Sequence, residues 1–170
     1  MNRIPFTLLI LVIFCMPNTT FSNSILKENV IIGVSYPIQK KILRFIKKQE
    51  PKGIILTGRG FSKAKTTKET ITMLNTLKEG YSPLISIDQE GGRVVRIKHG
   101  VSKFPSFLKI AQSNSIPYAE HLAYKRGKEL KDLGIDMIFG PVLDVNTVTS
   151  NPVIGDRSFG SDPSVVSKFG

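Results

Sequence analysis

The sequence predicts an α/β fold in which helices cover a parallel sheet. Short, uniformly apolar runs of strand length recur along the chain, and longer segments with apolar residues at helical spacing lie between them. Parallel strands are buried on both faces, and each parallel crossover needs a connection of helix length. Two folds fit this alternation. A flat doubly wound sheet would be self-contained at 170 residues, whereas an eightfold βα barrel needs about 250.

Four strands are expected along the chain. They are Val30–Val34, Gly53–Thr57, Leu84–Ile87 and Ile135–Val145. No G-x-G-x-x-G sequence follows the first strand, so the dinucleotide-binding form of the doubly wound sheet has no support. The third and fourth strands both end abruptly in polar segments, and chemistry is expected there.

Two helices are expected between the first three strands. Pro37–Gln49 is one, because its apolar residues share a face from which the lysines are largely absent. The apolar residues are Ile38, Ile42, Phe45 and Ile46, and the lysines are Lys40, Lys41, Lys47 and Lys48. The next helix opens at Thr66, whose spacing to Glu69 is that of a capping box. Its core side consists of Ile71, Leu74 and Leu77.

A longer helix is expected before the fourth strand. It begins at Ser115 and Pro117 and ends before Gly134, where a left-handed residue is expected. Its packing stripe consists of Ala119, Leu122, Ala123, Leu130 and Leu133.

The segment Pro83–Arg96, P-L-I-S-I-D-Q-E-G-G-R-V-V-R, is the centre of the predicted site. Gly91 and Gly92 let the backbone turn without Cβ clashes just after the third strand. This turn gathers carboxylates and guanidiniums at one strand terminus: Asp88, Glu90, Arg93 and Arg96. A surface hairpin carrying a salt-bridge cluster is the alternative.

A second segment, Gly134–Pro163, repeats the arrangement of a strand that opens into a polar loop. Asp144 stands at the expected strand end and is a candidate for the rim of the site. A structural role, in which its carboxylate accepts hydrogen bonds from N–H groups of the loop, explains it equally well. Asp156 and Arg157 follow in the sequence I-G-D-R-S-F-G.

Taken together, D-Q-E-G-G-R-V-V-R, F-G-P-V-L-D-V and I-G-D-R-S-F-G resemble glycoside hydrolase family 3, in its β-N-acetylhexosaminidase branch. The resemblance runs from roughly Val30 to the last residue, with the segments in the order and approximate spacing that the family shows. It implies a (β/α)8 TIM-type barrel, here truncated to about its first four βα units. Asp162-Pro163 then resembles the N-cap and first position of the helix after strand four.

The resemblance also implies an activity. The family hydrolyses a terminal β-linked sugar with retention, using an Asp nucleophile and, in this branch, a His acid/base. Both are expected beyond Gly170, so no catalytic residue and no cofactor or metal is expected within the chain. The expected ligand is a saccharide that contains N-acetylglucosamine, such as a peptidoglycan fragment. A non-catalytic sugar-binding remnant is the alternative function.

The resemblance assigns sugar-binding positions to three residues, Asp88, Arg96 and Arg157, with Glu90, Arg93 and Asp144 as further rim residues. Two positions depart from the family pattern. Asp156 stands where the family often has Asn, which adds a negative charge beside Arg157. Gly60 stands where Asn is common after the second strand.

The two histidines are expected to be solvated. His99 lies in a loop and His121 lies off the main stripe of the long helix, and neither has a His or Cys partner at metal-ligand spacing.

The net charge of +11 raises the question of a nucleic-acid partner. The charges are dispersed and lack interleaved aromatics, so no nucleic acid is expected. A solvated basic surface attracted to anionic cell-envelope material is preferred.

Residues 1–24 are expected to be a secretory signal peptide and 25–170 the N-terminal half of the barrel domain. Arg3 supplies a positive start, Leu8–Met16 the apolar stretch, and Pro17–Ser24 a polar exit. The protein is therefore expected to be secreted or periplasmic, with only transient membrane contact. An uncleaved anchor is the alternative. Cys15 is the only cysteine, so no internal disulfide can form.

A half barrel would leave its first and fourth strands with free edges. Self-association, or pairing with a complementary half barrel, is expected. A stable monomer would favour the doubly wound sheet instead.

Overall fold

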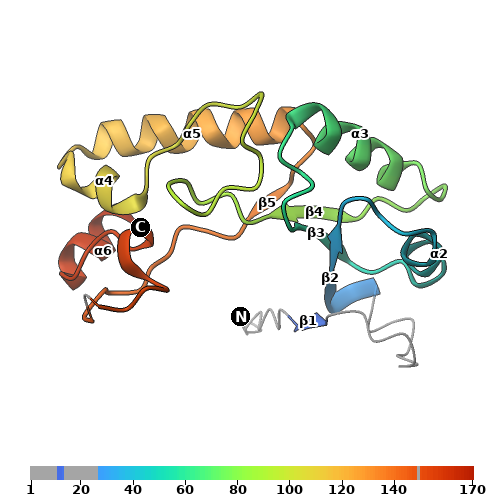
Figure 1. Cartoon of the computed structure of the whole chain (residues 1–170), viewed down its shortest axis with the longest axis horizontal. Helices are drawn as coiled ribbons and strands as arrows, with labels where there is room; N and C mark the ends of the chain where they lie inside the picture. Colours follow the sequence, from blue (N-terminus) through green and yellow to red (C-terminus); the bar gives the residue numbers. More distant parts are fainter. Residues whose placement is uncertain (1–10, 14–26, 149) are drawn as a thin grey trace, which may run out of the picture.

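The protein forms an open five-stranded parallel sheet with helices packed on one face (Figure 1). The computed structural model describes residues 11–13, 27–148 and 150–170. Neighbouring strands follow chain order and pair in parallel. The strands are β1 (Leu11–Ile13), β2 (Val30–Ser35), β3 (Gly53–Thr57), β4 (Leu84–Ile87) and β5 (Met137–Ile138).

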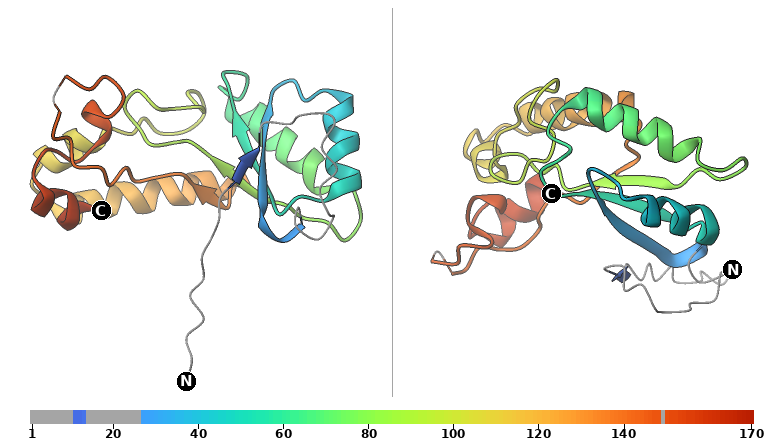
Figure 2. Two further views of the ribbon diagram at one scale, coloured as in Figure 1. Left: turned by 90° about the horizontal axis from the view of Figure 1, so that it is seen from below. Right: turned by 45° about the vertical axis from the view of Figure 1, so that its right-hand side comes forward.

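The helices fall into two groups, which Figure 2 shows at opposite ends of the molecule. Helices α2 (Lys40–Gln49) and α3 (Ala64–Asn75) cover the sheet at one end. At the other end lie α4 (Phe107–Gln112), the 3₁₀ helix η1 (Gly155–Arg157) and α6 (Pro163–Phe169). The long helix α5 (Ile116–Asp132) connects the two groups.

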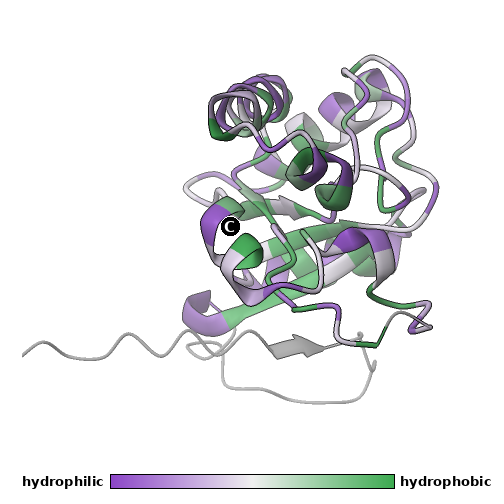
Figure 3. Cartoon of the chain, turned by 90° about the vertical axis from the view of Figure 1, so that its left-hand side faces the viewer, coloured by the Kyte–Doolittle hydropathy of each residue, from purple (hydrophilic) through white to green (hydrophobic). Residues whose placement is uncertain are grey.

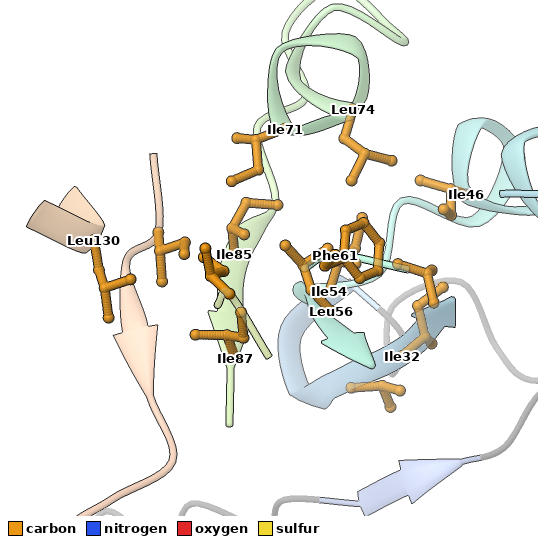
Figure 4. Packing of buried hydrophobic residues seen from close by; sticks show 14 residues of the cluster. Ile32, Ile46, Ile54, Leu56, Phe61, Ile71, Leu74, Ile85, Ile87 and Leu130 are labelled. Carbon is orange, nitrogen blue, oxygen red and sulfur yellow. The ribbon is translucent and has the colours of Figure 1, made fainter. Parts of the chain in front are cut away.

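The main core lies between the sheet and helices α2, α3 and α5. Alternate strand residues point toward the helices, which matches the two-residue period of a strand. Figure 4 shows Ile54, Leu56, Ile85 and Ile87 facing Ile46, Ile71, Leu74 and Leu130 of the helices. All eight side chains are at most 2% exposed. The colouring of Figure 3 shows the same separation, with hydrophobic strands beneath helices whose outer sides are hydrophilic.

A second, aromatic cluster holds α4 and α6 together. Phe107 of α4 lies 5.0 Å from Phe159, which in turn lies 5.9 Å from Phe169 of α6, measured between ring centroids. Ile110 and Val166 are buried in the same cluster. The polar segment that follows β5 is thereby anchored to a core of its own.

The first three predicted strands are confirmed, with β2 one residue longer than expected. The fourth is wrong in length, because β5 contains only Met137 and Ile138. Ladder-type hydrogen bonds extend one residue either way, from Asp136 N to Ile85 O at 2.8 Å and from Phe139 N to Ile87 O at 3.1 Å. Pro141 has no N–H to continue them, so the chain leaves the sheet.

The predicted start of the second helix is also wrong. Helix α3 begins at Ala64, so Thr66 lies inside the helix and forms no capping box with Glu69. Glu69 instead lies 4.0 Å from Lys65, one turn earlier. Helix α2 starts at Lys40, three residues after the predicted Pro37, and the short helix α4 was not predicted.

Both ends of α5 and the start of α6 are as predicted. The Ser115 hydroxyl accepts a hydrogen bond from Tyr118 N at the start of α5, and Gly134 after it has a φ of +89°. The Asp162 carboxylate caps α6 by accepting from Ser164 N at 2.8 Å. Within the predicted stripe of α5, Leu130 is buried, whereas Ala123 is exposed.

The predicted signal peptide lies outside the described residues except for Leu11–Ile13. Strand β1 pairs with β2 through Leu11 and Val30, so β2 is not an edge strand, contrary to expectation. The outer edge of β5 has no partner strand among the described residues. No helix of the described part has the length and apolar character needed to span a membrane.

Candidate sugar-binding site

The candidate site is an open hollow at the carboxyl ends of the central strands. The carboxyl ends of parallel strands meet at one edge of a sheet, where loops from several strands converge. The hollow has a volume of about 460 Å³. Its lining comes from β3, from the segments after β4 and β5, and from η1: Ile55, Thr57, Asp88, Glu90, Phe139, Gly140, Pro141, Val142 and Arg157.

The turn after β4 depends on its two glycines. Gly91 and Gly92 have φ angles of +108° and +54°, values that residues with a Cβ rarely adopt. A Cβ at Gly91 would also lie 2.4 Å from the carbonyl oxygen of Pro105. The predicted role of these glycines is confirmed, and the turn reverses the chain so that Arg96 returns to Asp88.

Gln89 holds the chain segment that returns after the turn, and the sequence analysis did not single it out. Its side chain is buried, its Nε2 donates to Ile97 O at 2.9 Å, and its Oε1 accepts from Arg96 N and Ile97 N at 2.8 and 3.0 Å. These three hydrogen bonds satisfy a buried amide and hold the backbone of Arg96 beside β4.

Asp88 and Arg96 form an ion pair at the hollow. Arg96 Nη2 lies 2.8 Å from Asp88 Oδ2, and both side chains remain about 30% exposed, at 31% and 29%. Because a carboxylate accepts several hydrogen bonds and a guanidinium donates five, this pair retains capacity for a ligand. Asp88 lines the hollow directly, whereas Arg96 contacts the hollow only through its pair with Asp88.

Glu90 and Arg157 form a bidentate pair that links the two predicted segments. Arg157 Nε and Nη2 donate to the two carboxylate oxygens of Glu90 at 2.8 and 2.7 Å, and Glu90 is only 5% exposed. The hydrogen bonds to Glu90 raise the pKa of Arg157, with smaller contributions from Asp88 and Asp144. Glu90 therefore places the guanidinium at the hollow and has no unengaged oxygen.

Arg93 and Asp156 pair with each other outside the hollow. Arg93 Nε lies 3.2 Å from Asp156 Oδ1, and its two Nη atoms donate to three backbone carbonyls at 2.6–3.0 Å. The carbonyls belong to Pro152, Val153 and Ile154. The charge of Asp156 thus binds Arg93, while Arg157 binds Glu90. Arg93 therefore holds the loop after β5 in place and does not line the hollow.

The remaining predicted positions lie away from the lining. Asp144 is exposed, and its carbonyl oxygen accepts from the hydroxyl of Ser158 at 2.5 Å. Asp136, before β5, accepts from Ile85 N at 3.0 Å and pairs with Lys131 at 2.7 Å. His99 and His121 are both exposed, as predicted.

Gly60 allows a close approach of two loops. A Cβ there would lie 2.7 Å from both the Cβ and the carbonyl oxygen of Tyr36. An Asn at this position would therefore require the loop after β2 to move, which explains why Gly suits this chain.

Arg126 of α5 supports the site from behind and was not predicted. Its Nη1 donates to Gln89 O at 3.1 Å and to Glu90 O at 2.5 Å, and its guanidinium lies 3.8 Å from the ring centroid of Phe104. Burial lowers the pKa of Arg126 to about 10. Arg126 and Arg157 thus hold the backbone and the side chain of Glu90, respectively.

Comparisons with known proteins agree with the fold and the segments described above. Residues 26–170 match the model of the glycosyl hydrolase family 3 N-terminal domain. The chain is 42% identical over 86 residues to the β-hexosaminidase LpqI of Mycobacterium tuberculosis, covering 50% of this chain and 22% of that protein. It is 33% identical over 124 residues to a β-hexosaminidase of Hydrogenovibrio crunogenus, covering 69% and 34%. The chain thus spans about a fifth to a third of the length of these relatives.

Solved structures show the same similarity. A family 3 β-N-acetylglucosaminidase from Paenibacillus superposes with a TM-score of 0.80 at 29% identity, over 89% of this chain and 30% of that one. NagZ from Neisseria gonorrhoeae, solved with N-trifluoroacetyl-D-glucosamine, superposes with a TM-score of 0.73 at 27% identity, over 82% and 44%. These relatives have (β/α)8 barrels, and the open sheet corresponds to part of such a barrel. The chain therefore belongs to glycoside hydrolase family 3, through the N-terminal domain of that family.

Proposed function

We propose that the chain forms the sugar-binding side of a β-N-acetylhexosaminidase, which removes terminal β-linked N-acetylglucosamine with retention. The proposal rests on one observation: Asp88, which is paired with Arg96, and Arg157 line the same hollow at the carboxyl ends of the strands. The names of the relatives support the choice of sugar, since they are β-hexosaminidases and β-N-acetylglucosaminidases.

The chemistry of these side chains suits a saccharide. Asp88 can accept hydrogen bonds from sugar hydroxyls, and Arg157 can donate to hydroxyl or carbonyl oxygens. A hydrogen bond to a charged group contributes about 1.5–3 kcal/mol.

Asp88→Asn is therefore expected to weaken binding of N-acetylglucosamine by about tenfold or more, which calorimetric or NMR titration measures. Asp132→Asn, at an exposed position of α5, is the matched control. Equal affinities for both variants would contradict the proposed site.

The proposal assigns no nucleophile or acid/base to this chain. Of the two carboxylates that line the hollow, Glu90 has both oxygens bound by Arg157, and Asp88 is paired with Arg96. Retaining hydrolysis needs one free carboxylate and one proton donor at the bond. We therefore expect no turnover of an aryl N-acetyl-β-glucosaminide by residues 1–170 alone. Hydrolysis that Asp88→Ala abolishes would assign the catalytic residues to this site.

A non-catalytic sugar-binding role is the second candidate, favoured by the same two engaged carboxylates. A longer chain that contains these residues and turns over the aryl substrate would exclude it.

We also propose export by the N-terminal segment, from the charge of Arg3 and the apolar stretch after it. N-terminal sequencing of the expressed protein is expected to find a start near Asn23 or Ile25, and an intact Met1 would contradict cleavage.

A further inference from the structure

Helix α2 carries its cations on one exposed face. The residues Lys40, Lys41, Arg44, Lys47 and Lys48 follow the helical spacing i, i+1, i+4, i+7 and i+8, and all are exposed. The opposite face packs into the main core through Ile42, Leu43, Phe45 and Ile46. We call the five cations the α2 cationic face.

The cations in the first turn and at the centre of α2 oppose the stability of the helix. Lys40 and Lys41 occupy the first turn, where the helix dipole disfavours positive charge, and neither an acidic residue nor a side-chain cap is present there. Arg44 lies four residues from both Lys40 and Lys48, a spacing at which like charges repel. Lys47 and Lys48 lie in the last turn, where the helix dipole favours positive charge, but Lys40, Lys41 and Arg44 gain nothing from it. Packing of the apolar face maintains the helix, so these three cations serve no evident purpose in folding.

Within the described residues, no acidic side chain pairs with the α2 cationic face. Between Val30 and Gly60 the chain contains seven Lys and Arg residues and one acidic residue, Glu50. The Glu50 carboxylate is already engaged by Lys27, at 2.6 Å, and by Lys78. None of the five cations forms an ion pair with a residue in the described part of the chain. The helix therefore presents a concentrated, unpaired positive charge to solvent.

The position of α2 allows a partner to bind without covering the sugar site. Helix α2 lies at the end of the molecule opposite α4 and α6 (Figures 1 and 2). At a rise of 1.5 Å per residue, the row from Lys40 to Lys48 is about 12 Å long. Such a row matches an extended array of negative charges better than a compact anion.

We infer that the α2 cationic face binds an anionic lipid surface through phosphate headgroups. The single aromatic residue of α2, Phe45, packs into the core, so the face offers no ring on which a nucleic-acid base could stack. Its apolar face is also occupied by the core, so the helix cannot insert and binding is electrostatic. Basic residues near an anionic membrane each contribute enough to change affinity about fivefold.

The test compares binding of the full chain to phosphatidylcholine vesicles with and without phosphatidylglycerol. The variant Lys40→Gln/Arg44→Gln/Lys48→Gln is expected to lose about 100-fold in affinity for the anionic vesicles. The matched control, Lys103→Gln/Lys109→Gln/Lys128→Gln, removes the same net charge from exposed positions outside α2 and is expected to stay within about threefold of the parent chain. A second variant, Lys41→Gln/Lys47→Gln, is expected to lose about 25-fold.

Three results would overturn the inference. Equal losses in the α2 and control variants would indicate attraction by net charge alone. Equal binding to both kinds of vesicle would indicate contact through apolar residues. Tighter binding to a DNA duplex than to anionic vesicles at the same salt concentration would assign the face to nucleic acid. Circular dichroism monitors folding, and removal of like charges is expected to leave α2 at least as helical as before.

Discussion

Single arginines determine how the strand ends meet in this protein. Arg157 bonds both carboxylate oxygens of Glu90, Arg93 bonds the loop after β5, and Arg126 bonds the backbone on either side of Glu90. Each of these guanidiniums connects segments separated by at least 36 residues in sequence. The two segments predicted to carry chemistry are therefore joined by side chains and not only by the sheet.

Arg126→Met is expected to destabilise the protein by about 1–3 kcal/mol, because it leaves the carbonyls of Gln89 and Glu90 without their donor. Methionine keeps apolar contact with Phe104 but not the positive charge over its ring, so the loss reports on the hydrogen bonds together with this cation–π contact. Urea denaturation measures it, with the exposed Lys128→Met on the same helix as control. A midpoint equal to that of the control would show that these carbonyls find other partners.

Gly91→Ala tests the turn itself. The positive φ and the 2.4 Å approach to Pro105 O both oppose a Cβ at this position, and strain with overpacking costs about 2–5 kcal/mol in total. Gly80 also has a positive φ, at +73°, but a Cβ there would meet nothing within 4 Å. Gly80→Ala is therefore the control for backbone strain alone. If both variants lost the same stability, the contact with Pro105 would not matter.

At the scale of helices and strands, apolar periodicity predicted what lies in the main core. The strands at Gly53–Thr57 and Leu84–Ile87 were found to the residue because their runs are mostly apolar and are followed or ended by polar residues. Helix α4 was missed because its six residues are too few to show a period. The length of β5 depends on Pro141 and on its partner strand β4, which has only four residues. The pattern of apolar residues, from which the fourth strand was predicted, contains neither of these limits.

The site was predictable to the extent that its residues form a motif. Asp88, Glu90 and Arg157 lie together at the hollow, and all three were named from the sequence. Gln89 and Arg126 were missed because they bond backbone atoms, and such contacts leave no spacing or charge pattern in the sequence.

Leu130→Ala tests how α5 is held on the sheet. Leu130 is 2% exposed in the main core, and truncating a buried leucine costs about 2–5 kcal/mol. Tyr124 on the same helix is 73% exposed, so Tyr124→Ala is expected to change stability by less than about 0.5 kcal/mol. Thermal or urea unfolding of the two variants measures the difference. A small loss for Leu130→Ala would show that α5 is attached mainly through its polar contacts.

At the scale of the whole molecule, the sheet is open where related proteins have a closed barrel. A closed barrel has no edge and fills its interior with side chains from every strand. Here the outer edge of β5 has no partner strand in the described residues, and Phe139 and Val142, which line the hollow, are only partly buried. The net stability of a domain is only about 5–15 kcal/mol. The free energy lost through incomplete burial of this face is therefore a substantial fraction of the net stability.

We therefore expect the isolated chain to self-associate or to bind a complementary part of the barrel, because either event would pair the β5 edge and cover the hollow. Analytical ultracentrifugation at increasing concentration is expected to show oligomers, and thermal unfolding is expected to be broad. Addition of a chain that supplies the remaining barrel strands is expected to sharpen the transition and raise its midpoint. A monomer at tens of micromolar with a sharp cooperative transition would contradict this prediction, since it would show that the helices on one face suffice to stabilise the open sheet.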